Sequence, residues 1–80
     1  MYTVGLFYKP TCGYCRKVLN YLEQNNITIP LKNVSEKPEV REELLKITGK
    51  TQVPCLMING APLLESDDII KWFRENWSQQ

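Results

Sequence analysis

The spacing of apolar residues changes several times along the chain, and each change marks an expected element of secondary structure. Segment 2–8 alternates weakly and carries Val, Phe and Tyr, so it predicts a buried strand. Apolar residues at helical spacing follow over 13–25 and predict the first helix. Segment 27–31 with Val34 predicts a second strand, in which Pro30 indicates an edge position or an irregular stretch.

The middle of the chain has the pattern of a helix with recognisable ends. Ser35 is typical of an N-cap, Pro38 suits the first turn, and Gly49 suits the C-terminal end. The apolar residues at 3–4 spacing that would form its inner face are Val40, Leu44, Leu45 and Ile47.

The last third predicts a hairpin followed by a helix. The apolar run 53–58 and segment 61–64 are expected to be strands, joined at Asn59-Gly60, the strongest hairpin signal in the chain. Ser66 is expected to cap the last helix, which has two aspartates in its first turn, where negative charge is favoured. The expected inner face consists of Ile69, Ile70, Phe73 and Trp77, and a fraying tail follows at 78–80.

This order of elements, β-α-β-α-β-β-α, predicts an α/β fold. Strands separated by helices are expected to pair in parallel through right-handed crossovers, and the hairpin adds an antiparallel edge. We therefore expect a single domain over 1–80, with a four-stranded mixed sheet flanked by three helices. A chain of this size buries only about 60% of its unfolded surface. With 42% hydrophobic residues it can still fold without a metal or structural disulfides.

Charge and composition exclude several classes of function. The net charge of +1 provides no basic stripe for phosphates, so nucleic acid is not an expected partner. The chain has no histidine, which excludes Cys–His and Ser–His catalysis and imidazole metal ligands. No stretch approaches the roughly 18 apolar residues of a membrane span, and no signal-peptide pattern is visible at the N-terminus. We expect a protein of the reducing cytoplasm, without a membrane partner.

Cys12 and Cys15 carry the most specific chemistry in the sequence. They lie where the first strand gives way to the first helix, whose free N–H groups favour an anion. This location should lower the pKa of Cys12 and make it the reactive thiol, with Cys15 close enough to form a disulfide. A structural zinc site needs about four ligands, and only Cys55 remains to join the pair. Buried inert thiols rarely begin a helix after a loop, so the pair predicts redox chemistry.

Pro54 lies at the start of an expected strand, where proline is confined to edges, strand ends or bulges. A cis Val53–Pro54 bond would turn the backbone of Val53 outward to pair with a peptide substrate. Because X–Pro bonds are cis in only about 5–6% of cases, the residues alone favour trans. Cys55 follows in an apolar run and is interpreted as a small core residue.

Three motifs together resemble a glutaredoxin over nearly the whole chain. They are Cys12-Gly13-Tyr14-Cys15 after a strand, Thr51-Gln52-Val53-Pro54, and Ser66-Asp67-Asp68 at the start of the last helix. The resemblance implies a thioredoxin-like fold in which a cis Val53–Pro54 bond faces the cysteines. It also implies glutathione as the bound thiol, a co-substrate. In the main interpretation we expect no metal.

The resemblance assigns roles to particular residues. It makes Cys12 the nucleophile and Cys15 the resolving thiol, and it pairs the Val53 backbone with the cysteinyl unit of glutathione. The helix start at Ser66 and Asp67 would hold the γ-glutamyl end, because a helix N-terminus binds carboxylate and an aspartate meets ammonium. The other residues placed around glutathione are Lys9 and Arg41 at the glycyl carboxylate, and Tyr14, Gln52 and Pro54 along the groove. For Lys9 and Arg41 a merely solvated side chain is the competing interpretation.

The sequence departs from the glutaredoxin pattern at three places. Gly13 replaces the proline common in dithiol members, and Gln52 stands where threonine is usual. Leu64-Glu65 replaces the usual Gly-Gly before the last helix. Glu65-Ser66 is instead similar to the glutathione-binding pair of glutathione transferases, in which Glu and Ser hold the γ-glutamyl group.

We therefore expect a monomeric, glutathione-dependent thiol–disulfide oxidoreductase. It would act on protein–glutathione mixed disulfides and on protein disulfides. One alternative is a dimeric carrier of a [2Fe–2S] cluster ligated by glutathione, which Gly13 permits because some glutaredoxins with that glycine hold such a cluster. Another alternative is a thioredoxin-like protein reduced by a flavin reductase.

Overall fold

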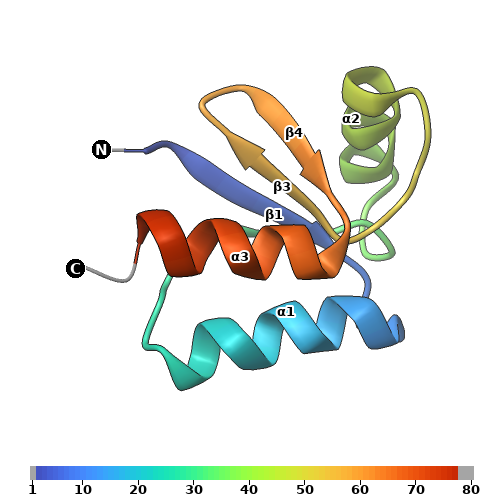
Figure 1. Ribbon diagram of the computed structural model, residues 1–80. Coiled ribbons are helices and arrows are strands. Elements are labelled where there is room, and N and C mark those ends of the chain that lie inside the picture. Colours follow the sequence, from blue (N-terminus) through green and yellow to red (C-terminus); the bar gives the residue numbers. More distant parts are fainter. Residues whose placement is uncertain (1, 78–80) are drawn as a thin grey trace.

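The expected order of elements is confirmed. The computed structural model describes residues 2–77, and its strands and helices follow the order β-α-β-α-β-β-α (Figure 1). They are β1 (Val4–Tyr8), α1 (Gly13–Gln24), β2 (Leu31–Asn33), α2 (Pro38–Thr48), β3 (Cys55–Ile58), β4 (Ala61–Leu64) and α3 (Ser66–Asn76). The tail predicted at 78–80 lies outside the described residues. None of the helices within 2–77 has the length and apolarity needed to cross a membrane.

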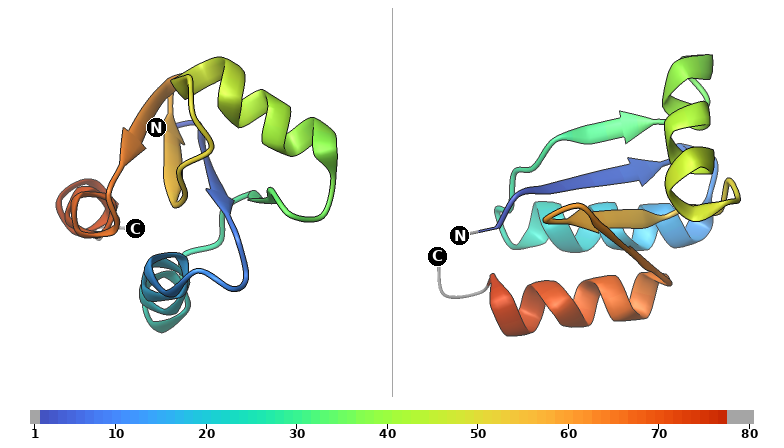
Figure 2. Two further views of the ribbon diagram at one scale, coloured as in Figure 1. Left: turned by 90° about the vertical axis from the view of Figure 1, so that its right-hand side faces the viewer. Right: turned by 90° about the horizontal axis from the view of Figure 1, so that it is seen from above.

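The sheet is mixed, as expected, but one strand direction differs from the prediction. The strand order is β2-β1-β3-β4, with β1 parallel to β2 and antiparallel to β3. We expected the helix between β2 and β3 to return the chain for a parallel pairing. Instead, α2 stays at the end of the sheet where β1 and β2 finish, so β3 starts there and runs back (Figures 1 and 2). The predicted hairpin forms between β3 and β4, with Asn59 and Gly60 at φ 50° and 89°.

The two faces of the sheet carry separate apolar layers. Leu6 and Leu56 are partners across β1 and β3, and both point into the layer covered by α1 and α3. Their neighbours Phe7 and Cys55 point to the opposite face, where Leu44 of α2 packs. The alternation of side chains along a strand produces this division. Cys55 is fully buried, which confirms its interpretation as a core residue.

The second strand begins later than predicted. Residues 27–30 lie outside β2, although Ile29 is buried against the α1–α3 layer. Pro30 still contributes its carbonyl oxygen, which accepts a hydrogen bond from the Leu6 N–H at 3.0 Å. Regular pairing with β1 starts only at Leu31, because proline has no N–H to donate. The segment is apolar because it contributes to the core, and only its end is a strand.

The second helix differs from the prediction at its start and on one face. Its N-cap is Lys37, and Pro38 is the first helical residue. Ser35 instead donates from its N–H and hydroxyl to the Asn33 side chain, which closes a turn ahead of the helix. Leu45 was expected on the inner face but is 47% exposed. The apolar layer on this side of the sheet is small, and it buries Leu44 but not its neighbour.

The last helix begins one residue after its N-cap, and the N-cap is Glu65, not Ser66. Glu65 has φ 77°, a region that L-residues other than Asn and Asp rarely adopt. Glutaredoxins usually carry glycine here, and the backbone conformation explains that preference. The helix ends at Asn76, and its C-cap, Trp77, is half-buried against the α1–α3 layer. This turn from β4 into α3 brings the start of the helix beside α1.

Candidate functional site

Cys12 is held at the start of α1 by a tight turn. Its N–H donates to the Lys9 carbonyl at 3.1 Å, and its own carbonyl accepts the first helical hydrogen bond, from Arg16, at 3.0 Å. Cys12 is therefore the N-cap residue, with an extended backbone and a side chain that is partly exposed. The loop and the helix place its sulfur beside unpaired backbone N–H groups.

The surroundings of Cys12 lower its pKa, as predicted. Burial by itself raises the pKa of the thiol, but four attractive contacts outweigh it. The thiolate accepts hydrogen bonds from the Cys15 N–H, the Cys15 thiol and the Tyr14 N–H, and the charge of Lys9 adds to them. These groups all stabilise the anion, so Cys12 is the better nucleophile near neutral pH.

Cys15 has the opposite character. Its side chain is fully buried, and this burial raises its pKa to about 11. The Lys9 N–H donates to its sulfur at 3.4 Å and lowers the pKa, but the bond to Cys12 and the charge of that neighbour raise it further. Cys15 is thus a protonated thiol that donates a hydrogen bond to the Cys12 thiolate. It lies close enough to the Cys12 sulfur to attack it.

The segment before β3 faces Cys12 from the other side. The Sγ of Cys12 lies 4.0 Å from the Val53 carbonyl oxygen, and the Val53–Pro54 bond is cis, as the resemblance implies. Val53 and Pro54 therefore lie beside the reactive sulfur although they are far from it in sequence.

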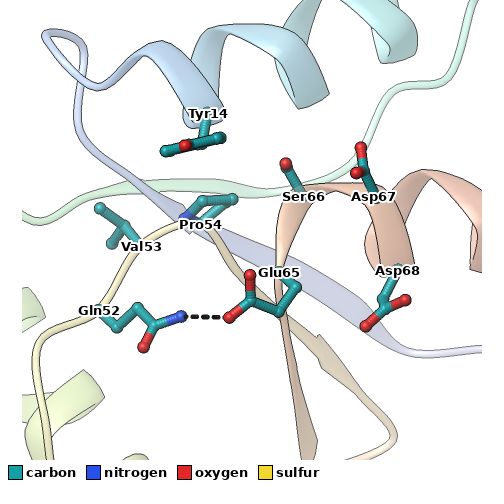
Figure 3. Close-up of a pocket in the computed structure, with 8 residues that line it drawn as sticks. All are labelled: Tyr14, Gln52, Val53, Pro54, Glu65, Ser66, Asp67 and Asp68. Atoms are coloured by element: carbon teal, nitrogen blue, oxygen red, sulfur yellow. Dashed lines mark hydrogen bonds between the residues drawn. The ribbon is translucent and has the colours of Figure 1, made fainter.

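A groove with a volume of about 570 Å³ opens next to the start of α1 and the Val53–Pro54 segment. Figure 3 shows that α1, the segment before β3 and the start of α3 all contribute to it. The residues that line it are Tyr14, Gln52, Val53, Pro54, Glu65, Ser66, Asp67 and Asp68. The structure thus brings together the seven groove residues predicted from the sequence. Asp68 is an eighth, predicted only as a first-turn charge.

Polar contacts fix several of these side chains. The Gln52 amide donates to the Glu65 carboxylate at 3.2 Å across the groove (Figure 3). Asp67 forms an ion pair with Lys17 of α1. Ser66 is only 7% exposed, whereas Tyr14 is 69% exposed at the rim. The groove therefore combines a largely buried serine, three carboxylates and an exposed aromatic ring.

The two predicted cationic residues lie apart from the groove lining. Lys9 is close enough to Cys12 to affect its pKa, so it lies on the cysteine side of the site. Arg41 lines a different hollow, with Pro38, Leu45 and Thr51 among its neighbours. Thr51 precedes Gln52, so the hollow lies near the groove along the chain, but Arg41 does not line the groove itself.

Lys17 was missed by the sequence reasoning. It lies on α1 one turn beyond Tyr14, and such spacing places it on the helix face that carries Tyr14. Sequence spacing could have identified this face, but not that α3 lies against it.

This arrangement supports thiol–disulfide exchange. A thiolate with a lowered pKa can attack a disulfide, and a second thiol nearby can displace the bound partner. Within residues 2–77, no group of three or more His, Cys, Asp or Glu side chains could hold a metal ion.

Comparison with known proteins agrees with this chemistry. The glutaredoxin family model matches residues 4–62. An uncharacterised glutaredoxin-like 8.6 kDa protein of Clostridium pasteurianum is 32% identical over 71% of this chain and 76% of its own length. Glutaredoxin 3 of Escherichia coli is 28% identical over 86% of this chain and 83% of its own length.

Solved structures extend the comparison. The holo form of glutaredoxin C1 from Populus tremula x tremuloides matches 92% of this chain and 76% of its own, with 26% identity and a TM-score of 0.70. The buckwheat glutaredoxin–glutathione complex shares the fold at 22% identity, with a TM-score of 0.72 over 98% and 74% of the two chains. A glutathione S-transferase, unclassified 2, from Bombyx mori has 25% identity and a TM-score of 0.82 over 98% of this chain and 37% of its own.

Proposed function

This chain belongs to the glutaredoxin family, which consists of thiol–disulfide oxidoreductases, and we propose that glutathione is its thiol substrate. The observation that carries the proposal is the pair of unlike thiols beside a groove that ends at a helix N-terminus. Cys12 is the thiolate, Cys15 is a buried thiol, and the α3 N-terminus with Ser66 suits a carboxylate. Two of the three solved structures compared above, a glutaredoxin–glutathione complex and a glutathione S-transferase, carry glutathione in their names.

In the first route, the substrate is a protein–glutathione mixed disulfide. The Cys12 thiolate attacks the glutathione sulfur, the S–S bond breaks, and the protein thiolate leaves and takes up a proton. A second glutathione thiolate then attacks the glutathione sulfur on Cys12. Oxidised glutathione leaves, and Cys12 returns as a thiolate, so the mixed disulfide is reduced at the expense of one glutathione.

In the second route, the substrate is a protein disulfide. Cys12 forms a mixed disulfide with one sulfur of the target, and the other sulfur leaves as a thiol. Cys15 then loses its proton, attacks Cys12 and releases the reduced target, which leaves a Cys12–Cys15 disulfide. Two glutathione molecules reduce this disulfide and become oxidised glutathione.

The proposal places glutathione along the groove. The Val53 backbone would pair with the cysteinyl unit, next to the Cys12 sulfur. The start of α3, at Ser66 and Asp67, would hold the γ-glutamyl end. Lys9 from the cysteine side and Arg41 from the neighbouring hollow would attract the glycyl carboxylate, and the exposed Tyr14 ring would cover the groove.

Two cysteine variants test the function. Cys15→Ser should keep reduction of a small glutathione mixed disulfide within about tenfold of wild type, because that route uses one thiol. The same variant should lose reduction of a protein disulfide, and Cys12→Ser should lose both activities. Turnover by Cys12→Ser, or wild-type activity that requires a flavin reductase and ignores glutathione, would overturn the proposal.

The [2Fe–2S] alternative depends on a second copy, because the described part of one chain offers no complete ligand set. We propose instead a cytoplasmic monomer that acts on glutathionylated and disulfide-containing proteins. Anaerobic purification with glutathione separates the two functions. A colourless monomer is expected, and a brown dimer that dissociates on oxidation would favour the cluster carrier.

A further inference from the structure

A second hollow adjoins the site on the side of α2, and we call it the α2 hollow. Its volume is about 410 Å³. Thr51 lines the α2 hollow, and the next residue, Gln52, lines the groove beside Cys12. Figures 1 and 2 place α2 at the end of the molecule where α1 begins. The residues that line the α2 hollow are Pro38, Arg41, Glu42, Leu45, Lys50 and Thr51.

The α2 hollow combines an exposed apolar side chain, that of Leu45, with positive charge. Arg41 and Lys50 contribute two cations against the single carboxylate of Glu42, and within residues 2–77 neither cation forms an ion pair. The groove beside it has the opposite character, because its described lining includes three carboxylates and no Lys or Arg. The surface around the site is therefore positive and apolar on one side and negative on the other.

Hydrogen bonds fix the backbone of Lys50 at the end of α2. The Lys50 N–H donates to the Thr48 hydroxyl at 3.3 Å, and that hydroxyl lies 2.7 Å from the Lys50 carbonyl oxygen, to which it can donate. Gly49, between them, adopts a φ of 78°, so the chain turns directly after the helix. The backbone that carries the Lys50 ammonium group is thus held in place before any substrate binds.

A polypeptide substrate has to extend beyond its reacting sulfur. When a target cysteine is joined to Cys12, its neighbours lie near Val53, whose carbonyl oxygen is 4.0 Å from the Cys12 Sγ. Thr51 is two residues from Val53, and an extended chain covers roughly 3.3 Å per residue. A target segment can therefore reach the α2 hollow within about two or three residues of its cysteine. The cations and the leucine there are complementary to acidic and apolar side chains.

We propose that the α2 hollow is the docking surface for the protein substrate, and that it receives an acidic and apolar segment close to the target cysteine. An apolar side chain of the target would contact Leu45, and an acidic one would lie near Lys50. This inference rests on the proposed function and extends its second route, in which a protein disulfide is reduced. Neither Leu45 nor Lys50 has a role toward glutathione, whereas Arg41 has one and is left unchanged in the test.

Two synthetic peptides serve as probes. The acidic peptide is Glu-Leu-Gly-Gly-Cys-Gly-Gly-Leu-Glu, which presents the same residues on both sides of its cysteine, and the basic peptide carries Lys in place of Glu. Both are blocked at their ends and joined through cysteine to thionitrobenzoate. The Cys12 thiolate attacks the peptide sulfur, the S–S bond breaks, and coloured thionitrobenzoate leaves with its electron pair. The mixed disulfide of glutathione with thionitrobenzoate is the small probe.

Wild type should react about threefold or more faster with the acidic peptide than with the basic one, and added salt should reduce this preference. Leu45→Ala should slow the reaction with the acidic peptide about threefold, because the leucine of the peptide loses an apolar contact. The same variant should react with the glutathione probe within about twofold of wild type, since the first route does not use Leu45.

Leu31→Ala is the matched control for this change. Leu31 is 50% exposed and lines another hollow, which shares no residue with the site and has no Lys or Arg in its described lining. This variant should keep all three rates within about twofold of wild type.

Lys50→Glu tests the charge of the α2 hollow. It should remove or reverse the preference for the acidic peptide, because the cation nearest the proposed acidic side chain becomes an anion. Lys71→Glu makes the same change on α3, where Lys71 lines a different hollow, and it should keep the preference within about twofold of wild type. The ratio of the two peptide rates cancels any effect of either variant on the reactivity of Cys12.

The outcomes separate this inference from the function on which it rests. Equal wild-type rates with the two peptides, a preference unchanged in Lys50→Glu, or equal slowing by Leu45→Ala and Leu31→Ala would each overturn the inference alone. A wild-type protein that reacts no faster with the glutathione probe than with the mercaptoethanol mixed disulfide of thionitrobenzoate would overturn the proposed function.

Discussion

At the scale of single residues, the two cysteines of the site differ because their surroundings differ. Cys12 caps a helix, so backbone N–H groups point at its sulfur and lower its pKa. Cys15 lies one turn further along, where the fold covers it completely and burial raises its pKa to about 11. Only two residues of helix, Gly13 and Tyr14, thus separate a nucleophile from a reserve thiol that stays protonated until Cys12 has reacted.

Lys9→Gln should raise the pKa of Cys12 slightly, because the Lys9 charge lowers that pKa and an exposed charge acts weakly through solvent. The rate of iodoacetamide alkylation of Cys12, followed against pH, measures it. In wild type the rate should rise with pH to a midpoint below the ordinary thiol value of about 8.5. In the variant the midpoint should move upward, and added salt should shrink the difference.

Lys46→Gln, on α2, provides the control because it removes the same charge at a residue that does not contribute to the Cys12 pKa. Equal shifts in the two variants would show that net charge, and not proximity, sets the pKa. A wild-type midpoint at or above about 8.5 would contradict the account of the site.

Cys15 should make the fold sensitive to alkali. Its pKa is about 11 in the folded chain and about 8.5 when unfolded, so the folded state holds the proton longer. Stability is therefore fully present below about pH 8.5 and falls as the pH rises toward 11. Urea unfolding at pH 8 and pH 10.5, with a non-thiol reductant, should show a loss in wild type larger by about 2 kcal/mol than in Cys15→Ala.

The comparison of losses removes the contribution of Cys55, whose pKa is also raised by burial and which is present in both proteins. Equal losses in wild type and Cys15→Ala would contradict the prediction.

At the scale of elements, the sequence predicted the existence and the C-terminal end of α2 correctly but its buried face only in part. Pro38 and Gly49 mark its ends, and Gly49 adopts the left-handed φ of 78° expected of a helix C-cap. Its sequence carries adjacent leucines, of which Leu44 is fully buried and Leu45 is 47% exposed. The helix packs on the sheet through one narrow stripe.

Leu44→Ala and Leu45→Ala form a matched pair on this helix. Leu44→Ala should lower the free energy of unfolding by about 2–5 kcal/mol, because it leaves a cavity in the layer with Phe7 and Cys55. Leu45→Ala should change it by less than about 1 kcal/mol. Urea denaturation of both variants tests the pair, and similar losses would mean that Leu45 is also buried in solution.

At the scale of the whole molecule, one sheet supports two separate layers. The α1–α3 layer contains Leu6, Leu56 and Phe73, and both helices start at the same end of the molecule (Figure 2). Residues at these two helix starts line the groove. The α2 layer on the other face is smaller and contains Phe7. The central strands β1 and β3 belong to both layers, so they hold the cysteine loop and the Val53–Pro54 segment in place together.

Amide hydrogen exchange should follow this arrangement. Amides of β1 and β3 should exchange at least about tenfold more slowly than those of β2 and β4, because the edge strands can open without exposing both layers. Mass spectrometry or NMR at neutral pH would measure the rates. Protection as strong in β4 as in β3 would contradict the division into centre and edges.

The sequence by itself determined the order of elements, the hairpin at Asn59-Gly60 and the reactive pair. Each depends on neighbours along the chain: apolar spacing, turn residues, or a cysteine at a helix start. For the same reason, the direction of the Cys12 pKa shift could be predicted, since the N–H groups responsible belong to the next turn of the same helix. The seven groove residues were identified from motifs that the resemblance connects.

Only the tertiary structure decided which of these residues meet and with what charge. The antiparallel direction of β3 depends on the end of the sheet at which α2 lies. The exposure of Leu45 depends on which face of α2 is turned toward the sheet. The pairing of Lys17 with Asp67, and of Gln52 with Glu65, joins segments that are distant in sequence. Such contacts arise from packing of whole elements, which local patterns do not specify. They determine which charged and polar side chains of the groove already have partners within the chain.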